Sequence, residues 1–553
     1  MLVTELRNPV TNGAFYVTIH NTSSSGTLEQ FQLHVNTSEG LLTIPQKGGN
    51  IALNGHQSKI ICTDFSFGSE KLIYSTAEVL TYAVLDGVPT LALWVSDGED
   101  VEFSVANAQG AQVSRCQGCS NVNISRGNSS VVVSLTQGTG MSVVMLQNGV
   151  RVLTLSRSSA YQTWVPTLTN DPFAPENETI IVQGPYLVRG ATLVDSTLAI
   201  TGDLSGPTTL EVFAPRAIQH VTWNGQTVAV QKTQYGSLTS QLSGPNQTIT
   251  LPLLTNWKYK GSLEEHKQDY KDNGPAWVLA NHTTTPNPTK PASLPVLYVD
   301  DYGFHNGIHL FRGYFSGTAS SVFLNIQGGT AFGYSVYLNG DHIGSFYGSA
   351  ALEAGNGTYS FKNATYHAPS SGKENVLFVI QDNTGHDETT GALNPRGILQ
   401  ATLLTPDNST LNFTTWKIAG TAGGDSQQID PVRGALAEGG LHAERLGWHL
   451  PGFDDKSWAN ASVGSAANDS AMLSFKGAGV SFYRTVVPLS IPSGVDVSIA
   501  FNLAAPGPQT MRVQLFVNGY QYGRYNPWIG HQTVFPVPPG VSYIVISTHI
   551  DEY

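Results

Sequence analysis

Acidic side chains are the first candidates for chemistry, because two carboxyl groups about 5–5.5 Å apart can cleave a glycosidic bond as nucleophile and acid/base. Neighbouring carboxylates occur at Asp97-Gly98-Glu99-Asp100, Glu264-Glu265, Asp300-Asp301 and Asp454-Asp455. We expect the first group in a hairpin turn, the second in a polar linker and the last at a helix start. Asp300 and Asp301 open a predicted strand, where neighbouring side chains point to opposite faces. We therefore predict no catalytic residue in this chain.

Histidine and cysteine offer little for metal chemistry. His305 and His309 are four residues apart, but the surrounding glycines favour strand or loop, and on a strand this spacing separates the rings by about 13 Å. Cys116-Gln117-Gly118-Cys119 lacks the second pair that a zinc ribbon needs. One disulfide among Cys62, Cys116 and Cys119 is favoured over free thiols, with its pairing left open. We predict no metal site and no cofactor.

Tryptophan could serve a different purpose, stacking on sugar rings. The last part of the chain holds Trp448, Trp458 and Trp528. Burial in a β-sandwich core is the competing and favoured interpretation, since Trp buries a large area. Trp448 and Trp528 are the candidates for carbohydrate contact.

The elements that would position these residues are strands. The chain has 553 residues, enough for several domains, with 57 Gly, 29 Pro and only 12% charged residues, a composition that disfavours helices. Short apolar alternations between turn residues predict strands over 88–105, 130–135 and 141–155. The best short helical candidate is 262–270. The sequence therefore predicts an all-β fold.

Net charge and glycosylation sequons bear on the partners and the cellular location of the protein. A net charge of −12 argues against nucleic acid, and no apolar run approaches the ~20 residues of a membrane span. The start of the chain has no signal peptide, yet Asn-x-Ser/Thr sequons exceed the chance expectation of roughly six. These glycosylation candidates are Asn21, Asn36, Asn123, Asn128, Asn177, Asn246, Asn281, Asn356, Asn363, Asn408, Asn412, Asn460 and Asn468. The excess predicts a secreted parent protein whose natural N-terminus lies before Met1.

Segments rich in Pro, Gly and polar residues divide the chain into four consecutive β-rich modules. These are 1–180, 181–258, 259–412 (a linker and a sandwich) and 413–553. Asn339-Gly340 and Asn518-Gly519 occupy matching places in the last two modules, and Asn224-Gly225 is a third such pair. Asn-Gly favours a type I′ hairpin, in which both turn residues have positive φ. The matching frames predict that the last two modules are tandem jelly rolls.

Several motifs in chain order resemble fungal β-galactosidases of glycoside hydrolase family 35. They are Ile73-Tyr74-Ser75-Thr76-Ala77-Glu78-Val79, Val221-Thr222-Trp223-Asn224-Gly225, Leu310-Phe311-Arg312-Gly313-Tyr314-Phe315, Gly439-Gly440-Leu441-His442-Ala443-Glu444-Arg445 and Pro451-Gly452-Phe453-Asp454-Asp455-Lys456-Ser457-Trp458. The similarity runs from the family's second domain to its fifth, and it implies two final jelly rolls of the galactose-binding-like type. It also implies that the catalytic (β/α)8 barrel, with its two glutamates, would precede Met1. The family's closing strand is expected to be shortened or replaced after Gly540.

The resemblance implies that this chain is the non-catalytic portion of a secreted enzyme that hydrolyses terminal non-reducing β-D-galactosides with retention. This chain alone is predicted to be inactive, with the barrel as its partner and galactosides as a candidate ligand. The alternative is a free-standing secreted carbohydrate-binding or adhesion protein. An in-frame barrel in the DNA upstream of Met1 would discriminate between the two.

Overall fold

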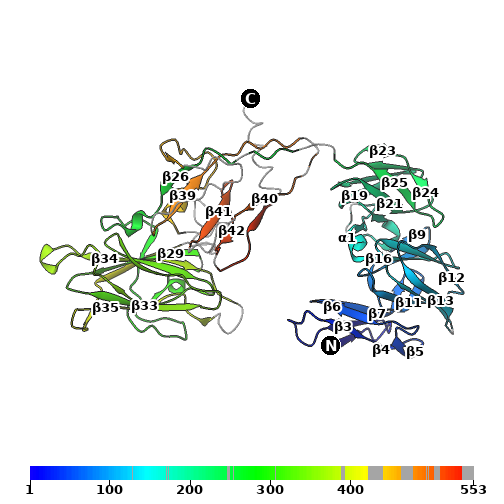
Figure 1. Ribbon diagram of the computed structural model, residues 1–553, viewed down its shortest axis with the longest axis horizontal. Helices are drawn as coiled ribbons and strands as arrows, with labels where there is room; N and C mark the ends of the chain where they lie inside the picture. The colour runs from blue at the N-terminus through cyan, green and yellow to red at the C-terminus, as the bar shows by residue number, and fades with distance from the viewer. Residues whose placement is uncertain are drawn as a thin grey trace. The chain divides into compact units, whose positions relative to one another are not determined.

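The computed structural model describes residues 1–127, 129–169, 171, 173–245, 249–252, 254–305, 307–387, 393–420, 440–461, 478–492, 495, 497–503, 511–527 and 529–538. The chain forms two compact units, Met1–Thr248 and Ile249–Tyr553. Strands dominate both (Figure 1), and the α-helices among the described residues are the short α1 (Arg157–Tyr161) and α2 (His442–Arg445). The all-β prediction is confirmed. No helix in these ranges has the length and apolar content to cross a bilayer.

The first unit begins with two facing sheets. One has the strand order β1 (Leu2–Arg7), β2 (Ala14–Ile19), β7 (Ser58–Phe67), β8 (Glu70–Ser75), β11 (Asp100–Ala106), β14 (Ser130–Thr136) and β13 (Ser120–Arg126). The other has the order β12 (Ala111–Arg115), β15 (Met141–Leu146), β16 (Arg151–Ser156), β10 (Val88–Val95) and β9 (Glu78–Leu85). Buried residues of both sheets, such as Phe103, Val133, Leu93 and Val152, form one core between them.

The connection from β10 to β11 corrects one prediction. Residues 88–105 do form two strands, but β10 lies in one sheet and β11 in the other. The carboxylates of Asp97 and Glu99 therefore lie in a crossover between sheets and not in a hairpin turn. Alternating apolar residues identify a strand, but they do not say which sheet it joins.

The first sheet also packs against two small two-stranded sheets on its other face. These are β3 (Leu28–Phe31) with β6 (Ile51–Asn54), and β4 (Leu33–Thr37) with β5 (Gly40–Ile44). Tyr16 of β2 and Ile61 of β7 point into the resulting core beside Val35 and Ile44. One face of β2 and β7 is thus buried by these two small sheets.

The rest of the first unit is a second pair of sheets. Their orders are β17 (Thr163–Trp164), β18 (Ile181–Gln183), β21 (Thr208–Phe213), β25 (Leu238–Leu242) and β24 (Gln231–Lys232), and β19 (Leu187–Val194), β20 (Thr197–Asp203), β22 (His220–Trp223) and β23 (Gln226–Val228). Phe213, Ile181 and Tyr235 pack against the outer face of the β9-β10 sheet, so the two pairs of sheets share a core. Since β17 pairs with β18, the predicted boundary at 180 divides one sheet.

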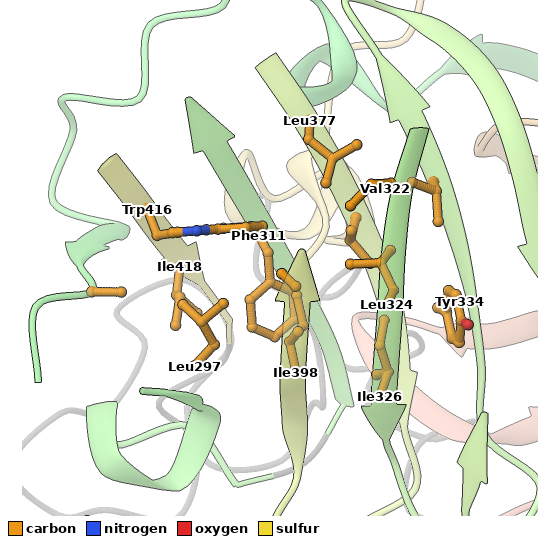
Figure 2. Packing of buried hydrophobic residues seen from close by; sticks show 14 of the residues in the cluster. Leu297, Phe311, Val322, Leu324, Ile326, Tyr334, Leu377, Ile398, Trp416 and Ile418 are labelled. Carbon is orange, nitrogen blue, oxygen red and sulfur yellow. The ribbon is translucent and has the colours of Figure 1, made fainter. Parts of the chain in front are cut away.

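The second unit contains a large sandwich. One sheet has the order β27 (Trp277–Leu279), β37 (Thr415–Ala419), β29 (Gly307–Phe315), β34 (Asn375–Asn383), β31 (Gly333–Leu338) and β32 (Asp341–Phe346). The other has β28 (Leu297–Tyr298), β35 (Gly397–Leu404), β30 (Ser321–Gln327) and β33 (Ala354–Ser360), with β36 (Thr410–Leu411) beside β35. Figure 2 shows Phe311, Leu377 and Trp416 of the first sheet facing Leu324 and Ile398 of the second. The jelly-roll topology remains a prediction.

Two strands in the second unit pair across the predicted module boundaries. β37 follows residue 412, yet it hydrogen bonds to β29 inside the large sandwich. β26 (Lys258–Gly261) lies at the predicted linker, yet it is the middle strand between β38 (Ala459–Asn460) and β39 (Ser481–Arg484). The described chain is completed by the pairs β40 (Ile499–Asn502) with β43 (Val534–Val537) and β41 (Val513–Val517) with β42 (Tyr520–Tyr525).

The three Asn-Gly hairpins are confirmed. Asn224 and Gly225 connect β22 to β23, Asn339 and Gly340 connect β31 to β32, and Asn518 and Gly519 connect β41 to β42. All six residues have positive φ, as a type I′ turn requires. The predicted helix over 262–270 shrinks to a 3-10 turn at Glu264–His266.

Candidate functional site

Two of the four groups of neighbouring acids are paired with basic side chains. The buried Glu265 forms an ion pair with Arg445, whereas Glu264 pairs with Lys267 at 2.5 Å on the surface. Asp455 pairs with Arg484 at 3.1 Å, and its neighbour Asp454 is exposed. Each carboxylate thus lies beside its own cation, and such ion pairs are expected to stabilise the fold.

Asp300 and Asp301 lie in a 3-10 turn over Val299–Tyr302 and not on a strand, which corrects the prediction. The two oxygens of Asp300 lie 2.9 Å from the Nδ1 atom of His305 and 2.9 Å from the Nε2 atom of His386. Asp301 accepts a hydrogen bond from Thr285 Oγ1 at 3.1 Å. The acidic pair is therefore divided between two separate hydrogen-bonding groups.

His309 does not share a site with His305. It lies within β29 and is completely buried, while His305 lies outside the strand and is half exposed. Burial, with the charges of Arg524 and His305 adding to it, lowers the pKa of His309 to about 3. Within the described part of the chain, no group of three or more His, Cys, Asp or Glu residues could hold a metal ion.

The remaining acidic group, Asp97-Gly98-Glu99-Asp100, is divided as well. Glu99 forms a largely buried ion pair with Lys59 of β7. Asp100 accepts a hydrogen bond from Thr136 Oγ1 at 2.9 Å, across the pairing of β11 with β14. Asp97 lies instead at the edge of a shallow cavity.

That cavity has a volume of about 590 Å³ and lies in the first unit. Its lining is polar apart from one ring: Asn54, Gln57, Ser96, Asp97, Arg157, Ser158 and Tyr161. The guanidinium of Arg157 stands 5.8 Å from the centre of the Tyr161 ring, which is 70% exposed. The cavity could accept a small polar molecule, but it brings Asp97 near no second acid among its lining residues.

Sequence reasoning missed two deeply buried acids, Glu102 and Glu211. Glu102 accepts hydrogen bonds from the Tyr74 hydroxyl at 2.8 Å and from the backbone N–H of Lys47 at 2.7 Å. Glu211 accepts hydrogen bonds from Arg115 at 2.5 Å and Ser237 Oγ at 2.7 Å. The sequence did contain a signal for both, because each is an acid flanked by apolar residues within a strand, where a buried carboxylate needs a partner.

The second unit adds two further buried acids with two cations each. Asp272 lies 2.9 Å from Arg312 Nε and 2.8 Å from Lys417 Nζ. Burial alone would raise the pKa of Asp272, but hydrogen bonds from Lys417 and Tyr314 and the charge of Arg312 lower it. Asp382 is paired with Arg512 at 2.9 Å and with Arg524.

Trp448 is buried, with 4% of its surface exposed. Its ring packs against Trp458 at 4.7 Å and Phe482 at 6.1 Å, and the ammonium of Lys260 lies 5.2 Å from its centre. These contacts agree with the core-packing interpretation, and sugar contact through Trp448 stays a prediction. Trp528 lies outside the described residues.

The predicted glycosylation sites can be compared with the surface. The sequon asparagines within the described ranges are all exposed: Asn21, Asn36, Asn123, Asn177, Asn281, Asn356, Asn363, Asn408, Asn412 and Asn460. Asn128, Asn246 and Asn468 lie outside those ranges. Among the cysteines, Cys116 and Cys119 form a disulfide and Cys62 is a buried free thiol, which resolves the pairing that the sequence left open.

Family models match most of the chain. Residues 1–162 match "Beta-galactosidase, domain 2", residues 164–239 match "Beta-galactosidase, domain 3", and residues 270–387 and 442–546 match "Beta-galactosidase second all-beta domain". The first two matches meet where β17 begins, in agreement with the strand pairing.

Curated relatives agree with these models. A protein of Aspergillus niger named "Probable beta-galactosidase B" is 57% identical over 97% of this chain and 52% of its own length. A protein of the same name from Emericella nidulans is 56% identical over 98% of this chain and 53% of its own length. The chain thus spans about half the length of the relatives that it matches. A solved α-L-rhamnosidase from Aspergillus terreus overlaps with a TM-score of 0.16 at 12% identity, covering 66% of this chain and 32% of that one, too little to bear on the fold.

The order of three successive domain models, together with relatives more than half identical along nearly all of the chain, shows that this chain belongs to the beta-galactosidase family.

Proposed function

We propose that this chain is the non-catalytic all-β portion of a secreted beta-galactosidase. The parent enzyme hydrolyses terminal non-reducing β-D-galactosides with retention, and the reaction takes place in a (β/α)8 barrel outside this chain. The β modules support that barrel and help to shape its entrance. The observation that carries the proposal is the family match over about half of each relative's length.

The contacts of the buried carboxylates also support a non-catalytic role for this chain. A retaining glycosidase needs two carboxyl groups about 5–5.5 Å apart and open to substrate. The buried acids Glu102, Glu211 and Asp272 each accept hydrogen bonds from donors of the fold. Using one of them in catalysis would break contacts on which the core depends.

Turnover of a chromogenic β-galactoside tests the proposal. The purified chain should show no turnover. The same chain joined to the half of the Aspergillus niger relative that it does not span should be active. Turnover by the chain alone, or an inactive but folded joined protein, would refute the proposal.

Secretion is part of the same proposal. We expect glycans on the exposed sequons when the protein is made in a fungal host, because their asparagines are accessible. Treatment with an N-glycosidase should lower the mass toward the 59.2 kDa of the polypeptide. An unchanged mass would count against a secreted parent. Titration calorimetry of the whole chain with galactosides separately tests the free-standing binding protein, which strong binding would favour.

A further inference from the structure

The two sheets of the first sandwich differ in width. The sheet that contains β1, β2 and β7 faces the sheet that ends at β9. β9 reaches the first sheet at β7, where the carboxylate of Glu78 accepts a hydrogen bond from the backbone N–H of Ile60 at 3.0 Å. β1 and β2 lie beyond this point in the strand order, so they overhang the edge of the facing sheet. β2 pairs with β7 and β1 is the edge strand of the sheet; the N-terminus, next to which β1 begins, is marked beside β3 in Figure 1.

The overhanging face is apolar. In the register of the sheet, Leu6 is opposite Phe15, Leu2 is opposite Ile19, and Val17 is opposite both Thr4 and Ile60. Side chains alternate along each strand, so these residues share one face, while Tyr16 and Ile61 point to the other face and its core. We call Leu2, Leu6, Phe15, Val17, Ile19 and Ile60 the overhang face.

The overhang face brings together five exposed large apolar side chains. Leu2 is 49% exposed, Leu6 57%, Phe15 44%, Ile19 41% and Ile60 45%. At roughly 200 Å² for a large apolar side chain, these fractions amount to on the order of 450 Å² of contiguous surface. The largest apolar patch on a typical monomer covers about 300–600 Å² and is often functional.

We infer that the overhang face docks the half of the parent enzyme that this chain does not span. This inference rests on the proposed function, because it takes the relatives' remaining half as the partner. That half is of comparable length, since each relative is covered to 52–53%. Two folded halves of one chain can meet over such a surface, and the overhang face is largely apolar, with Thr4 among its side chains.

The area of the overhang face favours docking of the parent enzyme's other half over docking of a second copy of the chain. A stable complex of separate proteins buries about 800 Å² on each partner, well above the overhang face. A covalently joined domain needs less, because the linkage gives it a high effective concentration at the face. A small apolar patch is therefore better suited to a partner on the same polypeptide.

Hydroxyl-radical footprinting tests the inference on two proteins, the chain alone and the chain joined to the half of its Aspergillus niger relative. In the joined protein, we expect the labelling of Leu6, Phe15 and Ile60 to fall at least fivefold. Val122, 42% exposed, and Ile124, 39% exposed, should be labelled equally in both proteins. They lie on β13 at the opposite edge of the same sheet, so they are matched controls.

Variants provide a second measurement. Phe15→Thr with Ile60→Thr keeps strand propensity but removes apolar surface. It should leave the melting temperature of the chain alone nearly unchanged and lower that of the joined protein by several degrees. Val122→Thr with Ile124→Thr should affect both proteins equally.

Three results would overturn the inference. The first is equal labelling of the overhang face in both proteins. The second is a face already protected in the chain alone, which would mean that its own second unit covers it. The third is a dimer of the chain alone, by sedimentation, that Phe15→Thr with Ile60→Thr dissolves. Galactoside turnover by the joined protein is read separately, so an active joined protein with an unprotected face refutes the docking inference alone.

Discussion

Replacing Asp272 by Asn should destabilise the second unit strongly, because it removes the counter-ion of a guanidinium that water cannot reach. Arg312 is 0% exposed, whereas Lys417, the other cation on Asp272, is 26% exposed and can turn to solvent. Asn keeps the size of the side chain and removes its charge. The variant therefore tests the ionic contacts of residue 272, chiefly the one with Arg312 of β29.

The expected loss of stability in Asp272→Asn follows from the contacts that Arg312 keeps. Removing one partner of a buried ion pair costs about 3–5 kcal/mol. The Nη1 atom of Arg312 still donates hydrogen bonds to the carbonyl oxygens of Glu265 and Lys267, so we expect the lower end of that range. At roughly 2 °C for each kcal/mol in a domain of this size, about 3 kcal/mol lowers the melting temperature by about 6 °C.

Differential scanning calorimetry of the whole chain is the assay. The transition of the second unit should move and that of the first unit should stay. Asp454→Asn is the matched control, because Asp454 is 71% exposed and lies 4.0 Å from Lys456. Removing both buried charges, with Asp272→Leu and Arg312→Met, should recover part of the loss. A shift for Asp272→Asn no larger than that of Asp454→Asn would refute the reasoning.

Three further predictions follow from single residues. The fold lowers the pKa of Asp272, so the stability that its charge contributes is complete above the ordinary pKa of about 4 and is lost as the pH falls through the folded pKa. The difference in melting temperature between Asp272→Asn and the parent chain should therefore shrink between about pH 5 and pH 2. A difference that stays constant over this range would contradict this linkage. Burial, with the charge of Glu78 adding to it, raises the pKa of the Cys62 thiol to about 12; a thiol reagent at neutral pH should therefore label the unfolded chain once and leave the native chain unlabelled. Gly313→Ala would place a Cβ atom 2.7 Å from the Trp416 ring and should cost about 1–3 kcal/mol by overpacking, measured by chemical unfolding against Gly261→Ala, whose Cβ would meet nothing within 4 Å.

Local features of the fold were predictable from the sequence. The Asn-Gly turns were found because only certain residues tolerate positive φ at both turn positions, and this requirement is met within two residues. The strands over 88–105 and 130–155 were found because their alternation is a property of each segment alone. For such features, neighbours in the sequence carry the information.

The pairing between segments was not predictable in the same way. Nothing within residues 88–105 shows that β10 and β11 belong to different sheets, and nothing near 258 shows that β26 pairs with strands about 200 residues away. The partners of the neighbouring acids were unpredictable for a related reason. Glu264-Glu265 and Asp300-Asp301 are adjacent in the sequence, but Glu265 pairs with Arg445 and Asp301 with Thr285, which are both from other segments.

The position of β26 has a consequence for biosynthesis. The ribosome makes this strand about 200 residues before β38 and β39, which at roughly 5–20 residues per second is an interval of about 10–40 s. During that time its backbone N–H and C=O groups cannot pair with β38 and β39, which have not yet been synthesised. The nascent polypeptide can thus close its large sandwich before this small sheet, and anything that releases the chain early would leave β26 as an open site for aggregation.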